Sequence, residues 1–118
     1  MFRILGIDHL VLRTADVERL RRFYVDVLGC SVEREQPAFG LTQLRAGSGL
    51  IDLVSLDGPL GRAGGAGPGV EGRNLDHFCL RIDPFDGEAV RASLARTVWR
   101  QARWNSALAP KAKGRRCT

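Results

Sequence analysis

The chain has 118 residues, of which 44% are hydrophobic, 26% charged and 7% aromatic, and this composition excludes a disordered chain. No apolar run approaches the roughly 20 residues that a membrane-spanning helix needs, and three scattered cysteines exclude a disulfide framework. The net charge of +5 divides unevenly: residues 1–88 carry −3 and residues 89–118 carry +8. We therefore expect a small cytoplasmic protein with no signal peptide, whose basic character belongs to its tail.

The first 57 residues predict a βαβββ unit. Residues 3–13 are rich in aliphatic and β-branched side chains and predict a strand. Thr14 or Asp16 can cap the helix that comes next, and Gly29 can end it. The helix has apolar side chains at helical spacing, namely Val17, Leu20, Tyr24, Val27 and Leu28. Three short strands are predicted next, at residues 30–35, 41–45 and 50–56.

A glycine-rich segment separates this unit from the C-terminal part of the chain. Half of the fourteen glycines fall between Gly58 and Gly72, which predicts a loop. Residues 67–72 match the G-x-G-x-x-G pattern of dinucleotide sites, but a strand and not a helix is predicted after them. We interpret the segment as a linker. A strand at residues 75–82 and a helix beginning near Asp86 are predicted beyond it.

An internal repeat is the strongest signal in the sequence. Residues 7–13 (IDHLVLR) align without a gap with residues 75–81 (LDHFCLR), and four of the seven positions are identical. Each copy precedes a predicted helix, and duplicated units that cannot bury an apolar face alone usually stack on one another. The repeat predicts four segments: a first module at 1–57, a linker at 58–73, the start of a second module at 74–96 and an atypical basic tail at 97–118.

Alternation along the predicted strands brings three polar residues to one face. His9, Asp52 and His77 all fall on the face opposite the helices, and the two histidines are the only ones in the chain. Histidine and carboxylate donors suit zinc, nickel, manganese or iron. A single strand histidine is commonly a hydrogen-bonded structural residue, so a purely structural role stays open.

The chain resembles the vicinal oxygen chelate superfamily of glyoxalase I, bleomycin-resistance proteins and ring-cleaving dioxygenases. The resemblance lies in residues 7–12, 22–29 (RFYVDVLG), 50–53 and 75–80. It implies an α+β fold in which paired βαβββ modules surround a metal cavity. By this resemblance His9, Asp52 and His77 are ligands of a divalent metal, although the family more often has Glu or Gln where Asp52 stands.

The resemblance also implies a chemistry. Arg13 matches a position that contacts an anionic substrate group, while a surface strand charge is an equal alternative. The family's fourth ligand has no counterpart in this sequence. The number of residues from His9 to Asp52, counted on from His77, leads to position 120, and the chain has 118 residues. The expected function is a glyoxalase-like lyase or isomerase that acts on a small substrate with neighbouring oxygens, with Asp52 as the only candidate base and with weak or no activity in this form.

Two other functions stay open. Resistance proteins of this fold bind a small molecule without catalysis, and two histidines with one carboxylate are also the donor set of iron oxygenases. The resemblance implies a homodimer in which one subunit completes the cavity of the other.

The tail differs from the body in composition. Residues 97–118 contain no acid, both lysines and both tryptophans, and no alternating strand pattern. A nucleic-acid arm or a membrane-surface helix would suit such a segment, but neither explains why a regular second module stops midway. We therefore expect no nucleic-acid or membrane partner, and our hypothesis is a change of reading frame near residue 96.

Overall fold

The computed structural model describes residues 1–105, which contain four strands and a small number of helices. The chain divides into two compact units, Met1–Ile82 and a second that begins at Asp83. The first unit contains β1 (His9–Thr14), α1 (Val17–Arg22), η1 (Phe23–Val27), β2 (Ser31–Gln36), η2 (Pro37–Phe39), β3 (Leu41–Ala46), β4 (Gly49–Ser55) and α2 (Pro59–Ala63). The second contains α3 (Gly87–Asn105).

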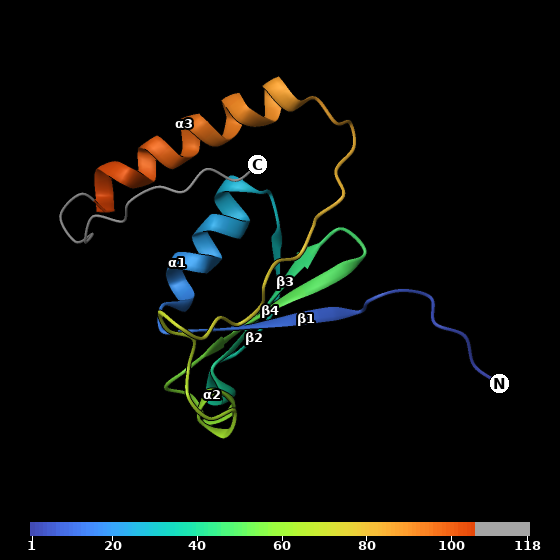
Figure 1. Cartoon of the computed structure of the whole chain (residues 1–118), viewed down its shortest axis with the longest axis vertical. Coiled ribbons are helices and arrows are strands. Elements are labelled where there is room, and N and C mark those ends of the chain that lie inside the picture. The colour runs from blue at the N-terminus through green and yellow to red at the C-terminus, as the bar shows by residue number, and fades with distance from the viewer. Residues whose placement is uncertain (106–118) are drawn as a thin grey trace. The chain divides into compact units, whose positions relative to one another are not determined.

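The first unit is one βαβββ module, as the sequence predicts (Figure 1). Its sheet has the order β1-β4-β3-β2, with β1 and β4 parallel and the other neighbours antiparallel. The helical segment α1–η1 begins where predicted, because the Asp16 side chain accepts a hydrogen bond from the Arg19 amide at 3.0 Å. It ends at Gly29, whose φ of 78° favours glycine.

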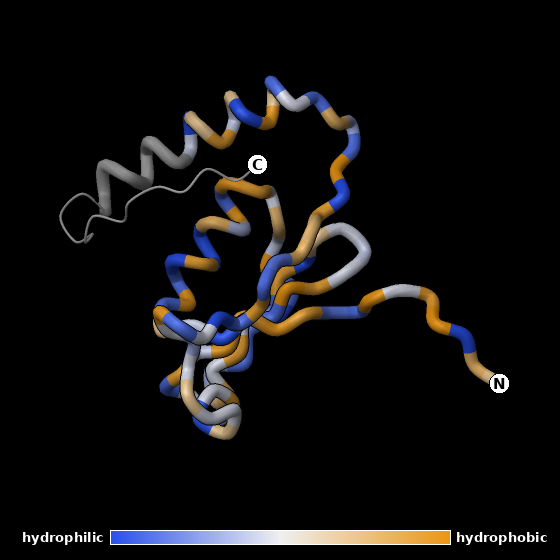
Figure 2. The backbone as a smooth tube through the Cα atoms, in the orientation of Figure 1, coloured by the Kyte–Doolittle hydropathy of each residue, from blue (hydrophilic) through white to orange (hydrophobic). Residues whose placement is uncertain are grey.

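One face of the sheet packs against α1–η1 and forms the core. The core residues Leu12, Leu44, Ile51 and Leu53 share this face of the strands, and Tyr24 of η1 packs against them. The middle of β4 is buried on both faces, since Asp52 and Val54 on the opposite face are as little exposed as the core residues, whereas the helical segment α1–η1 shows both hydrophilic and hydrophobic colours in Figure 2.

The first strand is shorter than predicted. It begins at His9, and residues 1–8 extend away from the sheet (Figure 1). The reason is the position of β4: the Leu50 amide donates to the Asp8 carbonyl, and the chain turns immediately before Gly49. No described strand lies opposite residues 3–7, so these residues have no ladder to join. Ile4, Leu5 and Ile7 are consequently more than 80% exposed.

The linker and the second copy of the repeat also differ from expectation. The linker contains a short helix, α2, which begins with Pro59 at its first position. Residues 75–82 form no strand, because a strand requires a neighbour and no described strand pairs with them. These residues belong to the first unit, where the Asn74 side chain donates to the Arg13 carbonyl at 2.6 Å and Phe78 packs against the core.

The second unit begins with the predicted helix. Asp86 accepts hydrogen bonds from the amides of Glu88 and Ala89, which fixes the start of α3. The helix continues beyond residue 96, where the basic tail was expected to begin, to Asn105; residues 106–118 of that tail lie outside the described residues. Within residues 1–105, no helix has both the length and the apolar character that crossing a membrane requires.

Candidate functional site

The face of the sheet opposite α1–η1 holds two of the predicted metal ligands. In the parallel pair β1–β4, Val11 is in register with Asp52, and residues in register point to the same face. Since His9 and Val11 are two residues apart on β1, His9 and Asp52 lie on one face, as predicted. Gln43 of β3 is in register with Asp52 and joins them there.

Asp52 is the most unusual side chain of this face. It is only 5% exposed, and its Oδ2 atom accepts a hydrogen bond from Gln43 Nε2 at 3.2 Å. Its Oδ1 atom is buried and has no hydrogen-bond partner among the described residues. A buried polar atom without a partner costs about 1–3 kcal/mol, and more when it is charged. A bound cation would supply the missing partner.

Each repeated histidine is held by the aspartate that precedes it. His9 Nδ1 lies 2.9 Å from Asp8 Oδ1, and His77 Nδ1 lies 2.6 Å from Asp76 Oδ2. A carboxylate at Nδ1 favours the tautomer that protonates this nitrogen and leaves Nε2 able to bind a metal. The hydrogen bond that His9 Nδ1 donates to Asp8, followed by the charge of Asp52, raises the pKa of His9 above its ordinary value.

The third predicted ligand is not brought into the same arrangement. His77 lies in the irregular segment after the linker, and its side chain is 75% exposed. Within residues 1–105, no group of three His, Cys, Asp or Glu side chains is placed so that it could hold a metal ion. The described part of one chain thus fits two positions of the predicted metal site and not the third.

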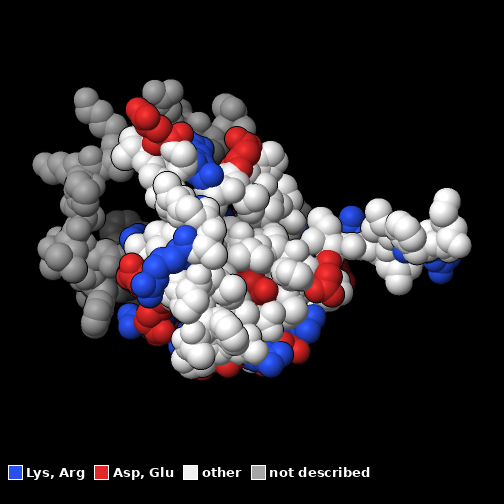
Figure 3. Space-filling view, turned by 90° about the horizontal axis from the view of Figure 1, so that it is seen from below, with Lys and Arg blue, Asp and Glu red and all other residues white. Residues whose placement is uncertain are grey.

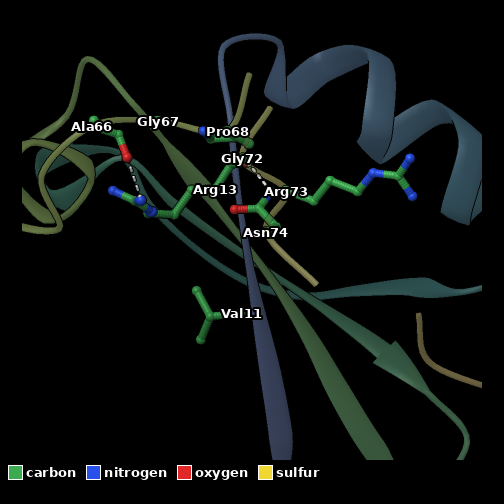
Figure 4. A pocket seen from close by; sticks show the side chains of 8 residues that line it. All are labelled: Val11, Arg13, Ala66, Gly67, Pro68, Gly72, Arg73 and Asn74. Carbon is green, nitrogen blue, oxygen red and sulfur yellow. Dashed lines mark hydrogen bonds between the residues drawn. The ribbon is translucent and has the colours of Figure 1, made fainter. Parts of the chain in front are cut away.

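Arg13 lines a pocket that adjoins this face (Figure 4). Its guanidinium donates to the carbonyls of Gly61, Gly65 and Ala66 at 3.3, 3.1 and 2.8 Å. The pocket has a volume of about 360 Å³, and Val11, Arg13 and Asn74 lie on its wall. Figure 4 shows the Arg73 side chain extending away from Arg13. Arg13 therefore holds the linker in place, and a contact with substrate would have to compete with three carbonyl groups.

The body carries charges of both signs. On the face shown in Figure 3, acidic and basic side chains are interspersed and not gathered by sign. Phosphate binding requires a basic patch or groove, which this face does not offer.

Three residues that contact the predicted ligands, Asp8, Asp76 and Gln43, were not predicted from the sequence. The two aspartates were visible as the Asp-His pair in both copies of the repeat, and a carboxylate beside a candidate ligand is a recognisable signal. Gln43 had no local signal, because its contact with Asp52 depends on the register between β3 and β4.

Comparison with known proteins agrees with this architecture. Residues 6–98 match the model of the Glyoxalase/Bleomycin resistance protein/Dioxygenase superfamily. The chain belongs to this superfamily. No curated protein matches the sequence. The fold is similar to that of several solved structures, all at low sequence identity.

Three of these structures illustrate the range of the likeness. An integron cassette protein from the Halifax Harbour sewage outfall metagenome is 18% identical, with a TM-score of 0.59 over 80% of this chain and 72% of that one. Lactoylglutathione lyase from Agrobacterium tumefaciens is 21% identical, with a TM-score of 0.58 over 80% and 71%. A virulence protein from Salmonella typhimurium is 20% identical, with a TM-score of 0.54 over 82% and 71%. At these identities the likeness shows the fold alone.

Proposed function

We propose that the chain is a glyoxalase-like lyase or isomerase for a small substrate with neighbouring oxygens, and that its metal position is built on His9 and Asp52. The observation that carries this proposal is the buried Oδ1 atom of Asp52, which has no partner among the described residues and shares a face with His9. The superfamily match to residues 6–98 supports the same conclusion.

The residues of this chain have separate roles in the proposed site. His9, Asp52 and His77 would hold the divalent ion, whose nature as zinc, nickel, manganese or iron the donors leave open. When bound, such an ion stabilises negative charge that develops on substrate oxygens. Asp8 and Asp76 orient the two imidazoles, and Gln43 fixes one oxygen of Asp52. Asp52 is the carboxylate that would move a proton between neighbouring substrate carbons.

A homodimer is part of the proposal. Of the three predicted ligands, the described residues of one chain place His9 and Asp52 on the site face, so a second copy would have to complete the cavity. Closed pairs with a two-fold axis are the commonest way for a chain to do this. We place the protein in the cytoplasm, where the free thiols of Cys30 and Cys79 would stay reduced.

A second candidate is small-molecule binding without catalysis. It is favoured by the absence of a three-residue metal group within residues 1–105 and by the pocket beside Val11 and Arg13. A pocket of about 360 Å³ is within the range of small-molecule sites. In this case the purified protein would take up no divalent metal.

Metal uptake by the purified full chain decides between the candidates. We expect saturable zinc or manganese binding that Asp52→Asn and His77→Ala each weaken by more than about ten-fold, while Asp57→Asn, an exposed carboxylate after β4, leaves it unchanged. The metal-loaded protein is then screened on α-keto aldehyde–thiol adducts. Unchanged stoichiometry in His77→Ala would remove His77 from the site, and absence of uptake by the unmodified chain would leave the binding function.

A further inference from the structure

The sheet face that carries His9 and Asp52 has more hydrogen-bond acceptors than donors. Asp52 Oδ1 is buried and has no partner among the described residues. His9 donates through Nδ1 to Asp8, so its Nε2 atom keeps a free lone pair. A cation can satisfy several such acceptors at once, whereas a hydroxyl group has only one hydrogen to donate. The orphaned atoms of this face therefore favour a cation as their partner.

Gln43 adds a third acceptor to this face. It lies in register with Asp52 on the neighbouring strand β3, so the two side chains share a face. Its Nε2 atom donates to Asp52 Oδ2 at 3.2 Å, and this contact fixes the orientation of the amide, because the amide oxygen in its place would meet a carboxylate oxygen. The side chain is partly exposed, and no described residue donates to its Oε1 atom. The amide oxygen is therefore available to a ligand.

This amide oxygen can take the place of a donor that the sequence lacks. The family's fourth ligand has no counterpart in the chain, and the described residues contain no group of three His, Cys, Asp or Glu side chains that could hold a metal. Carboxylate and carbonyl oxygens suit manganese, whereas zinc relies more on nitrogen and sulfur donors. We propose that Gln43 Oε1 is a further ligand of the divalent ion and shifts the preference of the site toward manganese; this rests on the proposed function.

A ligand and a residue that only positions Asp52 differ in their consequences. If Gln43 acts only through its hydrogen bond to Asp52, its loss weakens the binding of every metal by a similar factor, because every metal uses the same carboxylate. If Oε1 also binds the ion, its loss removes an oxygen donor on which manganese depends more than zinc does. The ratio of the two affinities therefore separates the two roles.

Titrations of the full chain with manganese and with zinc measure this ratio, with free manganese followed by its EPR signal. We expect Gln43→Leu to weaken manganese binding by about ten-fold and zinc binding by less than about three-fold, because leucine fills similar space without an oxygen. Gln43→Glu keeps an oxygen and should bind manganese at least as tightly as the unmodified chain. Gln36→Leu, the same substitution at the end of β2, should change neither affinity, since no described hydrogen bond joins Gln36 to His9 or Asp52.

The outcomes distinguish the role of Gln43 from the metal site itself. Equal weakening of both metals by Gln43→Leu, or no weakening of either, would overturn the ligand role and leave the site on His9 and Asp52 standing. No uptake of either metal by the unmodified chain would overturn the proposed function and the ligand role together. If Gln43→Leu fails to fold, Gln43→Glu decides: glutamate lacks the N–H that holds Asp52, so weakened manganese binding indicates positioning alone and retained binding supports the ligand role.

Discussion

Arg13 shows how one residue can fit both a functional and a structural pattern. On the sequence it stands four residues after His9, where the family resemblance implies contact with an anionic substrate group. In the folded chain its guanidinium is directed at three carbonyls of the glycine-rich segment. Hydrogen bonds from a charged group to backbone oxygens are individually stronger than neutral ones. The linker therefore depends on Arg13 whether or not a substrate also does.

Replacement of Arg13 by alanine tests this structural role. We expect the free energy of unfolding to fall by about 1–3 kcal/mol, because three carbonyls lose a charged donor. Hydrogen exchange should accelerate at the amides of residues 61–66. Arg62→Ala, an exposed arginine of α2, should change stability by less than about 0.5 kcal/mol. Urea denaturation of the two variants makes the comparison, and equal stability of Arg13→Ala and the unmodified chain would contradict it.

At the scale of elements, the sequence predicts what local periodicity controls. The helix from Val17 and the three later strands of the sheet were found within one or two residues of their expected limits. Alternation also placed His9 and Asp52 on the same face. The strand expected at 75–82 does not form, because strand formation depends on a neighbour that local sequence does not specify, and the role of His77 as a ligand stays a prediction. The short helix α2 was overlooked because glycine-rich composition predicts a loop.

The seating of α2 against β4 depends on a glycine. Gly61 is buried, and a Cβ atom there would collide with the Ser55 carbonyl oxygen and lie 2.6 Å from Leu56 Cα. Both contacts are backbone, so the strand end or α2 would have to move. We expect Gly61→Ala to reduce the free energy of unfolding by about 1–3 kcal/mol. Gly69→Ala is the control, because a Cβ atom there meets nothing within 4 Å. An equal loss of unfolding free energy in the two variants, measured by denaturant titration, would contradict this packing.

At the scale of the whole molecule, the repeat predicts a strand and a helix for the second copy, whereas the described residues contain the helix without the strand. The first module is complete, with four strands and the helix that covers them. The second copy contributes an irregular segment and then α3, and its apolar residues Leu75, Leu80, Ile82 and Phe85 are 41–76% exposed. Exposed apolar side chains in sequence-adjacent clusters favour association or aggregation. The superfamily match ends at residue 98, close to where the composition changes.

We propose that a change of reading frame near residue 96 accounts for these observations together. The segment beyond that point has no acidic residue and all the lysines and tryptophans of the chain, although the body is acidic. We expect the coding DNA, read one base out of phase after codon 96, to encode alternating strands and a late carboxylate that would supply the fourth ligand. Protein expressed from the corrected frame should unfold at a higher urea concentration and bind metal more tightly, because added strands would cover Leu80 and Ile82. If neither alternative frame encodes strands, the hypothesis fails. Salt-dependent nucleic-acid binding that is lost on deletion of residues 97–118 would instead identify the tail as a basic arm.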